Sequence, residues 1–207
     1  MPGLAALRDA LAEGRVARLG QFGAAPKDAR QAAVLILLSD EPSPTVLLTE
    51  RSPGLRAHAG QISFPGGGLE DGEDAVAGAL REAREEVGLP GDGVEPIGCL
   101  PSAWVPVSGY EVTPVVAAWQ QPTELIPSDP SEVAGVMRLP LEQLSDPAVR
   151  VTASLPGGYR GPAFELGEWF VWGLTAHLLD ATLTVGGWAR PWDRDRLRAV
   201  PDRFLRD

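Results

Sequence analysis

The chain has 207 residues, of which 28 are acidic and 18 basic, giving a formal net charge of −10 at pH 7. This length suits one globular domain, and the acidic balance argues against a nucleic-acid-binding protein, whose surface needs a basic stripe. A single cysteine, Cys99, excludes a disulfide framework and a cysteine-based zinc site.

The N-terminus and the apolar runs bear on the location of the protein. Arg8, Asp9 and Glu13 fall where a secretory signal would need an apolar stretch. The longest uninterrupted apolar run, Ala32–Leu38, is far shorter than the roughly 18 residues that a membrane span requires. We therefore expect a cytoplasmic protein without membrane or nucleic-acid partners, and the sequence leaves its oligomeric state open.

Apolar periodicity predicts an alternation of short strands and amphipathic helices. In chain order these are a helix at Leu4–Arg15, paired strands at Ala32–Leu38 and Thr45–Thr49, a helix at Asp74–Val87, strands at Val94–Leu100, Val112–Trp119 and Val133–Leu139, a helix at Phe170–Leu179 and a short terminal helix at Arg194–Phe204. Because strands and helices intermix without a repeat or a linker, we expect an α/β or α+β fold with a mixed sheet. We expect a single domain over residues 1–207, with an N-terminal helical extension over about residues 1–30.

The predicted helix Asp74–Val87 has an apolar face and an acidic face. On a helical wheel the apolar face consists of Val76, Leu80, Ala83 and Val87. Glu82, Glu85 and Glu86 fall on the neighbouring arc, where three carboxylates repel one another unless a cation lies among them. All-oxygen ligands of this kind suit Mg²⁺ or Mn²⁺, whereas the structural alternative is a solvated acidic face.

The residues around this helix favour the metal site over the solvated face. A glycine-rich stretch, Gly60–Gly72, leads into the helix, so that backbone can approach a ligand closely at its start. Glu73 and Arg81 are spaced to pair as opposite charges between the loop and the helix. Gly88 is placed to end the helix, as glycine commonly does.

The segment Gly67–Leu89 has the pattern G-x5-E-x7-R-E-A-x-E-E-x-G-L and resembles the Nudix box at every defined position, with alanine allowed at 83. The resemblance to Nudix hydrolases implies an α/β/α sandwich around a mixed sheet. It implies a metal-dependent enzyme that cleaves a nucleoside diphosphate linked to some moiety X. The implied metal ligands are Glu82, Glu85 and Glu86, with the carbonyl of Gly67 as a lesser ligand, and the pair Glu73 and Arg81 would support the site.

The segment upstream, Leu47–Gly67, resembles the pattern L-L-T-x-R-S-x-x-L-R-x-H-x-G-x-x-x-F-P-G-G of the coenzyme A pyrophosphatase branch. Members of this branch resolve coenzyme A into adenosine 3′,5′-bisphosphate and 4′-phosphopantetheine. Coenzyme A carries a 3′-phosphate besides its diphosphate, and the matching cationic and donor groups are Arg51, Arg56, His58 and Gln61. The alternative for these residues is a set of surface charges and an ordinary loop histidine.

Two other functions stay open beside a coenzyme A pyrophosphatase. One is a Nudix hydrolase of another nucleoside diphosphate, such as an ADP-sugar or a dinucleotide, and the other is a non-catalytic Nudix-fold binding module. The general base is also open: one helical turn separates Glu85 from Glu82, which favours Glu85 as the catalytic residue, and Glu111 and Glu132 are the alternatives. The number of metal ions and the choice among free, acylated and oxidised coenzyme A stay open as well.

Overall fold

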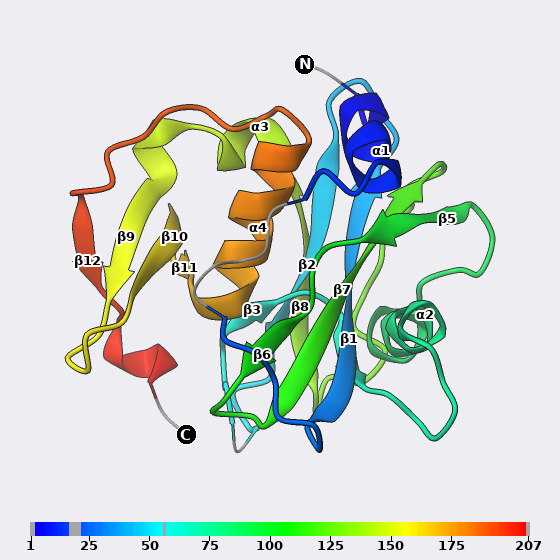
Figure 1. Ribbon diagram of the computed structural model, residues 1–207, viewed down its shortest axis with the longest axis horizontal. Helices are drawn as coiled ribbons and strands as arrows, with labels where there is room; N and C mark the ends of the chain where they lie inside the picture. The colour runs from blue at the N-terminus through cyan, green and yellow to red at the C-terminus, as the bar shows by residue number, and fades with distance from the viewer. Residues whose placement is uncertain (1–2, 17–21, 56, 206–207) are drawn as a thin grey trace.

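The computed structural model describes residues 3–16, 22–55 and 57–205, and Figure 1 shows their arrangement in two sheets with helices around them. The larger sheet contains β1 (Arg30–Ser39), β2 (Thr45–Arg51), β3 (Ile62–Ser63), β4 (Gly66–Gly68), β5 (Val94–Cys99), β6 (Ala103–Val105), β7 (Tyr110–Trp119) and β8 (Val133–Pro140). The smaller sheet contains β9 (Arg150–Ser154), β10 (Arg160–Leu166), β11 (Trp169–Val171) and β12 (Leu197–Ala199). The helices are α1 (Ala5–Ala12), α2 (Ala75–Val87), α3 (Leu141–Leu144) and α4 (Gly173–Val185), with 3₁₀ turns η1 (Pro147–Val149) and η2 (Asp202–Phe204).

The larger sheet is mixed, as expected. Its central path runs β3-β2-β1-β7-β5, and β4, β6 and β8 pair with β1, β7 and β2 respectively. Strand β1 runs parallel to β7 and antiparallel to β2, so the predicted pairing of the first two strands is confirmed. The short strand β4 lies antiparallel to β1, which brings the glycine-rich loop onto the edge of the sheet from which helix α2 departs.

Helices cover both faces of the larger sheet, and the alternation of side chains along β1 explains why. Leu35 and Leu37 pack with the apolar face of α2, whereas Ile36 and Leu38 pack on the opposite face with α4. Because both faces are buried, β1 is apolar at every residue from Ala32 to Leu38 rather than at every second one. Figure 1 shows α2 and α4 on opposite sides of the sheet, and the expected α/β/α sandwich is confirmed.

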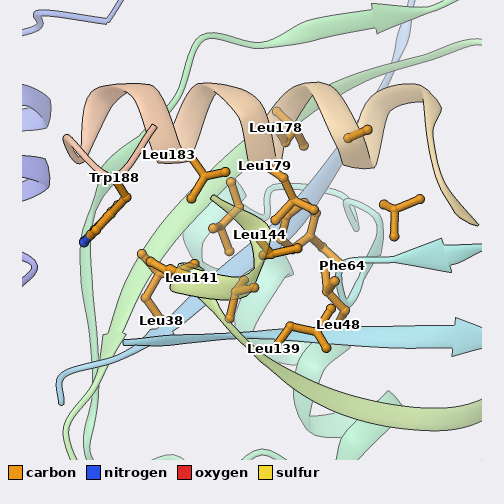
Figure 2. Close-up of a cluster of buried hydrophobic side chains, with 14 of the residues drawn as sticks. Leu38, Leu48, Phe64, Leu139, Leu141, Leu144, Leu178, Leu179, Leu183 and Trp188 are labelled. Carbon is orange, nitrogen blue, oxygen red and sulfur yellow. The ribbon is translucent and has the colours of Figure 1, made fainter. Parts of the chain in front are cut away.

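Helix α4 fills the space between the two sheets. Figure 2 shows Leu178, Leu179 and Leu183 of α4 packed toward Leu38 and Leu48 of the larger sheet. The helix therefore belongs to the main core rather than to the surface. No helix in the described residues is both long enough and apolar enough to cross a membrane.

The N-terminal helix is also confirmed, although it is shorter than the predicted span. Helix α1 covers Ala5–Ala12, and Leu7 and Ala10 face the core. The helix contacts β5 and α4, so this part of the N-terminal extension packs on the sandwich.

Strand pairing corrects two C-terminal predictions. The predicted helix Phe170–Leu179 is confirmed as α4, but it starts only at Gly173, because Phe170 and Val171 complete β11, which forms a tight hairpin with β10. The prediction of a helix at Arg194–Phe204 is wrong, because this segment adds β12 to the smaller sheet and ends in the turn η2. In both places strand pairing, with the neighbouring β10 in one case and the distant β9 in the other, overrides the local apolar periodicity.

A buried arginine connects the smaller sheet to α4. The side chain of Arg150 on β9 is 1% exposed and forms an ion pair with Asp180 of α4. Its guanidinium carbon lies 4.4 Å from the ring centroid of Phe164 and 4.6 Å from that of Trp192. The ion pair and the two aromatic faces compensate the burial of this charge and fix the smaller sheet on the helix.

Candidate active site

Helix α2 has the boundaries that its sequence predicts. The side chain of Asp74 caps its first turn by accepting a hydrogen bond from the backbone N–H of Ala77 at 2.8 Å. At the other end Gly88 adopts a left-handed φ of 66°, a conformation that suits glycine and stops the helix. Ala83 and Val87 are fully buried against the sheet, as the predicted apolar face requires.

The three glutamates of α2 lie in different environments. Glu86 is 6% exposed, and its carboxylate accepts a hydrogen bond from the backbone N–H of Gly66 at 3.3 Å. Glu82 is half-buried, with a side chain 18% exposed. The side chain of Glu85 is 60% exposed and accepts a hydrogen bond from Arg81 Nη1 at 3.3 Å. The acidic face thus divides into two glutamates directed inward and one directed outward.

A pocket of about 370 Å³ opens beside Glu82 and Glu86. Its polar wall contains these two carboxylates, Arg51 from the end of β2, and Glu132 from the segment before β8. The glycines of β4 form its floor, where a side chain at Gly67 would collide with the Glu82 carboxylate. Glycine at this position therefore allows the backbone to approach Glu82 closely.

Apolar side chains form another part of the pocket wall. Val34 of β1, Leu55 and Val112 line it together with the ring of Tyr110. The guanidinium of Arg30 lies 4.1 Å from the centroid of the Tyr110 ring and so holds one face of that ring. The lining therefore combines charged and apolar groups, which suits a ligand that has both characters.

The polar wall carries more negative than positive charge, and this affects the carboxylates. Burial, with smaller contributions from the nearby charges of Glu82 and Glu132, raises the pKa of Glu86 to about 7, against the hydrogen bond from Gly66 and the charge of Arg51. Burial likewise raises the pKa of Glu82. Both carboxylates would be stabilised in their charged form by a cation in the pocket.

A network around Arg81 links the glycine-rich loop to the helix. Its Nε and Nη2 donate to the two oxygens of Glu73, each at 3.0 Å, and Nη2 also donates to the carbonyl of Gly68 at 3.0 Å. Its Nη1 donates to Glu82 at 2.9 Å. The hydrogen bonds from Arg81 hold the pKa of Glu73 below its usual range. The predicted pair of Glu73 and Arg81 is therefore present, and it places β4 relative to Glu82.

The residues expected to bind substrate are distributed unevenly. Arg51 lines the pocket. Arg56 lies outside the described residues. The described residues that line the pocket do not include His58 or Gln61, which contact each other instead, with His58 Nδ1 3.2 Å from Gln61 Oε1.

Comparison with known proteins identifies the family. The NUDIX domain matches residues 29–155 of the chain. The chain belongs to the Nudix family. It is 40% identical over 181 residues to the Uncharacterized Nudix hydrolase NudL of Shigella flexneri serotype 5b, covering 80% of this chain and 88% of that protein. It is 41% identical over 172 residues to the protein of the same name from Escherichia coli K12, covering 76% and 83% of the two chains.

A solved structure supports the same fold. A NUDIX hydrolase from Nitrosomonas europaea superposes with a TM-score of 0.52 at 16% identity, covering 84% of this chain and 80% of that one. At this identity the likeness concerns the fold alone. The family match and the relatives named Nudix hydrolase establish the chain as a Nudix pyrophosphatase, an enzyme class that uses divalent metal ions.

The residues of this Nudix pocket include the donor atoms that such an ion prefers, but their side chains do not converge on one point. The carboxylates of Glu82 and Glu86 and the carbonyls of β4 are hard oxygen donors, the type that Mg²⁺ and Mn²⁺ prefer. Within the part of the chain that the structure describes, no three His, Cys, Asp or Glu side chains are arranged to hold a metal as they stand. Arg81 accounts for this, because its Nη1 is bonded to both Glu82 and Glu85.

Three glutamates were candidates for the general base, and the structure separates them. Glu132 lines the pocket and lies near enough to raise the pKa of both Glu82 and Glu86. Glu85 and Glu111 are not among the described residues that line the pocket, and Glu111 accepts a hydrogen bond from Gln31 at 3.2 Å. The arrangement therefore favours Glu132 over the Glu85 that the helical wheel favours.

The sequence did not identify the apolar wall. Val34 and Val112 belong to strands predicted as core, and only their positions at the edge where β1, β4 and β7 meet expose them to the pocket. No feature of the sequence distinguishes these two valines from the other apolar residues of their strands.

Arg81→Lys tests the network around the loop. Lysine keeps the charge but loses the planar group that bonds Glu73, Glu82 and Gly68 together. We expect activity to fall by about 10–100-fold, the usual effect of removing a group that orients metal ligands. Steady-state kinetics over a metal titration measure this loss. Wild-type activity at every metal concentration would show that the network does not position the site.

Proposed function

We propose that this Nudix pyrophosphatase hydrolyses the diphosphate bond of coenzyme A, giving adenosine 3′,5′-bisphosphate and 4′-phosphopantetheine. The observation that carries the proposal is the position of Arg51. This residue belongs to the segment that resembles the coenzyme A pyrophosphatase pattern, and it lines the same pocket as Glu82 and Glu86. The pattern and the box therefore contribute to one site.

The state of Arg51 supports an anionic ligand. Its Nε is buried and, within the described part of the chain, has no hydrogen-bond partner. A buried donor without a partner is costly, and a phosphate oxygen would satisfy it. Guanidinium groups bind phosphate through paired donors, so Arg51 suits one of the phosphates of coenzyme A.

The shape of the pocket supports the same substrate. Coenzyme A places a charged diphosphate between adenosine and the largely uncharged pantetheine arm. The carboxylates of the pocket suit the metal-bound diphosphate, and the apolar lining of Val34, Leu55, Val112 and Tyr110 suits a neighbouring uncharged part. We assign Tyr110 to this lining because Arg30 fixes its ring there.

Within this proposal, Glu82 and Glu86 with the carbonyl of Gly67 hold Mg²⁺ or Mn²⁺, and Glu85 joins them when its side chain leaves Arg81. A bound divalent ion supplies charge neutralisation on the phosphate oxygens and lowers the pKa of a bound water. Glu132 accepts the proton as the water oxygen bonds to phosphorus and the bridging P–O bond breaks. Arg51 holds a phosphate group during this step, and the departing phosphate takes the electron pair of the broken bond.

Product analysis tests the substrate. The protein is incubated with Mg²⁺ or Mn²⁺ and coenzyme A, dephospho-coenzyme A, ADP-ribose or a diadenosine polyphosphate, and the products are separated by chromatography. We expect coenzyme A to be cleaved with the highest kcat/KM and to give the two products named above. ADP-ribose or the dinucleotide cleaved as efficiently as coenzyme A would instead support a different nucleoside diphosphate as substrate.

Arg51→Ala tests the phosphate contact. If Arg51 binds a phosphate of coenzyme A, its loss should raise KM by about 10–100-fold, the usual range for a hydrogen bond to a charged group. The preference for coenzyme A over dephospho-coenzyme A should shrink if the 3′-phosphate is the group bound. Arg56→Ala provides the companion test for the second arginine of the pattern. An unchanged KM in both variants would exclude this role.

A further inference from the structure

Gln61 lies in the loop between β2 and β3, and its side chain forms a node of hydrogen bonds with two other parts of the chain. Its side-chain Nε2 donates to the backbone carbonyl of Phe204 at 2.8 Å. Because a carbonyl only accepts, this bond fixes the orientation of the amide, so that Oε1 faces His58 and accepts from a proton on His58 Nδ1 at 3.2 Å. Both ends of the Gln61 amide are therefore engaged within the protein.

The backbone of Gln61 connects this node to the pocket. The carbonyl of Gln61 accepts from the N–H of Arg51 at 3.0 Å, and the carbonyl of Arg51 accepts from the N–H of Gly60 at 3.1 Å. These two hydrogen bonds join the end of the loop to its beginning at Arg51, the residue that lines the pocket. A shift of Gln61 would be transmitted directly to Arg51.

The loop between these residues is not in a relaxed conformation. His58 has a φ of 59°, and it is the one described residue other than glycine in the left-handed region. Such a conformation is unfavourable for a side chain like histidine and persists only where its surroundings hold it. The Gln61 amide and the N–H of Gln61, which donates to the carbonyl of His58 at 3.1 Å, supply that restraint.

Phe204 lies in η2 and packs on the smaller sheet rather than on the larger one. Its ring is 5% exposed and packs in a separate apolar cluster with Val151, Ala153, Ala163, Phe170 and Val200. Strand β11 of the same sheet also lies against β3, the strand that follows Gln61. Figure 1 shows η2 at the C-terminal end of the chain, below the smaller sheet. Phe204 also lies beyond residue 155, where the matched NUDIX domain ends.

We propose that Gln61 is a positioning residue through which the smaller sheet and η2 hold the Arg51 loop in its substrate-binding shape. This inference rests on the proposed function only for the identity of the substrate. It assigns to the C-terminal part of the chain a role in substrate affinity, although that part contributes no described residue to the pocket lining. In this proposal Gln61 positions Arg51 and does not contact the substrate directly, which differs from the role expected from the sequence.

Two variants and one control test the inference in the full-length protein. Gln61→Met keeps the length of the side chain and removes both hydrogen bonds. Phe204→Ala loosens η2 from its cluster without touching the loop sequence. Val200→Ala removes apolar volume from the same cluster at a residue that does not bond Gln61, and so serves as the matched control.

Kinetics on the substrate that the panel identifies give the first measurement. We expect Gln61→Met and Phe204→Ala each to raise KM by about three- to tenfold with kcat within about twofold of wild type, the effect of losing one hydrogen bond. The double variant should resemble the single variants, because both weaken the same connection between Gln61 and η2. Val200→Ala should keep the wild-type KM. If Gln61 binds substrate directly, Phe204→Ala leaves KM unchanged and the inference is overturned.

Hydrogen exchange of the substrate-free protein gives a second measurement that does not depend on the substrate. Peptides covering residues 51–61 should exchange faster in Gln61→Met and in Phe204→Ala, but not in Val200→Ala. Faster exchange in the first two variants supports the coupling even if coenzyme A proves not to be the substrate. Unchanged exchange in both, or equal acceleration in the control, would overturn it whatever the enzyme hydrolyses.

Discussion

Replacing Glu86 by glutamine is expected to lower kcat/KM by about 10²–10³-fold, the scale of losing one group that stabilises charge at a reaction centre. Glu86 is the most deeply buried of the three glutamates on α2, and its carboxylate lies at the pocket beside Glu82. Glutamine keeps the size and can still accept the hydrogen bond from Gly66, so the loss reports the charge alone. Steady-state kinetics with saturating Mg²⁺ measure it, and Glu124→Gln, an exposed change of the same kind, is the control.

Glu86→Gln should lower activity but raise the thermal stability of the metal-free protein. The pKa of Glu86 is raised from 4.5 to about 7, so the folded protein binds its proton more tightly than the unfolded chain. The charge therefore destabilises the fold above pH 7 by up to about 3 kcal/mol, and this cost disappears as the pH falls toward 4.5. In EDTA, Glu86→Gln should melt at a higher temperature than wild type at pH 8 and at the same temperature near pH 4.5.

Two outcomes would contradict this view of Glu86. Wild-type kcat/KM in Glu86→Gln would remove the residue from the metal site. A lower melting temperature than wild type at pH 8 in EDTA would show that the buried charge is compensated without a metal ion. Loss of activity together with a gain in metal-free stability is the combination expected of a ligand held in place for a cation.

The parts of the fold that were predictable are those whose signals are local. Helix α2 carries its own cap at Asp74, its own stop at Gly88 and an apolar face that matches one side of a sheet. The uninterrupted apolar run in β1 likewise indicates a strand buried on both faces. In each case the information lies within one short segment, so tertiary contacts only confirm it.

The parts that were not predictable depend on contacts between distant segments. Strand β12 forms by pairing with β9, and Arg150 is buried only because Asp180, Phe164 and Trp192 surround it. No property of Arg150 in the sequence distinguishes it from a surface arginine. The sequence therefore does not indicate the smaller sheet. It does not indicate the hydrogen bond from Gln61 Nε2 to the carbonyl of Phe204 either.

The candidate site also combines features that a local segment predicts with features that depend on contacts between segments. The spacing of Glu82, Glu85 and Glu86 identifies the acidic face, but not which glutamate points inward. That choice is made by Gly66, whose N–H bonds Glu86, and by Arg81, which holds Glu85 outward. A helical wheel treats neighbouring glutamates alike, whereas the loop that packs on the helix does not.

Glu132→Gln is expected to lower kcat by about 10²–10⁴-fold with little change in KM, the range typical of a lost general base. Glu132 lines the same pocket as Glu82 and Glu86, and it is exposed, so that its carboxylate can accept a proton and release it to solvent. Its backbone is fixed, because the N–H of Ser52, next to Arg51, donates to its carbonyl at 2.8 Å. The proposed base and Arg51, the proposed phosphate ligand, therefore belong to one connected unit.

Comparison of three variants makes this assignment testable. Glu85→Gln should lose less in kcat than Glu132→Gln, because the side chain of Glu85 is 60% exposed and bonded to Arg81 outside the pocket. Glu111→Gln should stay near wild type, because its carboxylate bonds Gln31 on β1. Metal titration distinguishes a base from a metal ligand. The activity lost with a base stays lost at saturating metal, whereas the activity lost with a ligand is partly restored. If Glu85→Gln is the inactive variant at saturating Mg²⁺ and Glu132→Gln remains active, the helix supplies the base and the outward position of Glu85 is not the one used in catalysis.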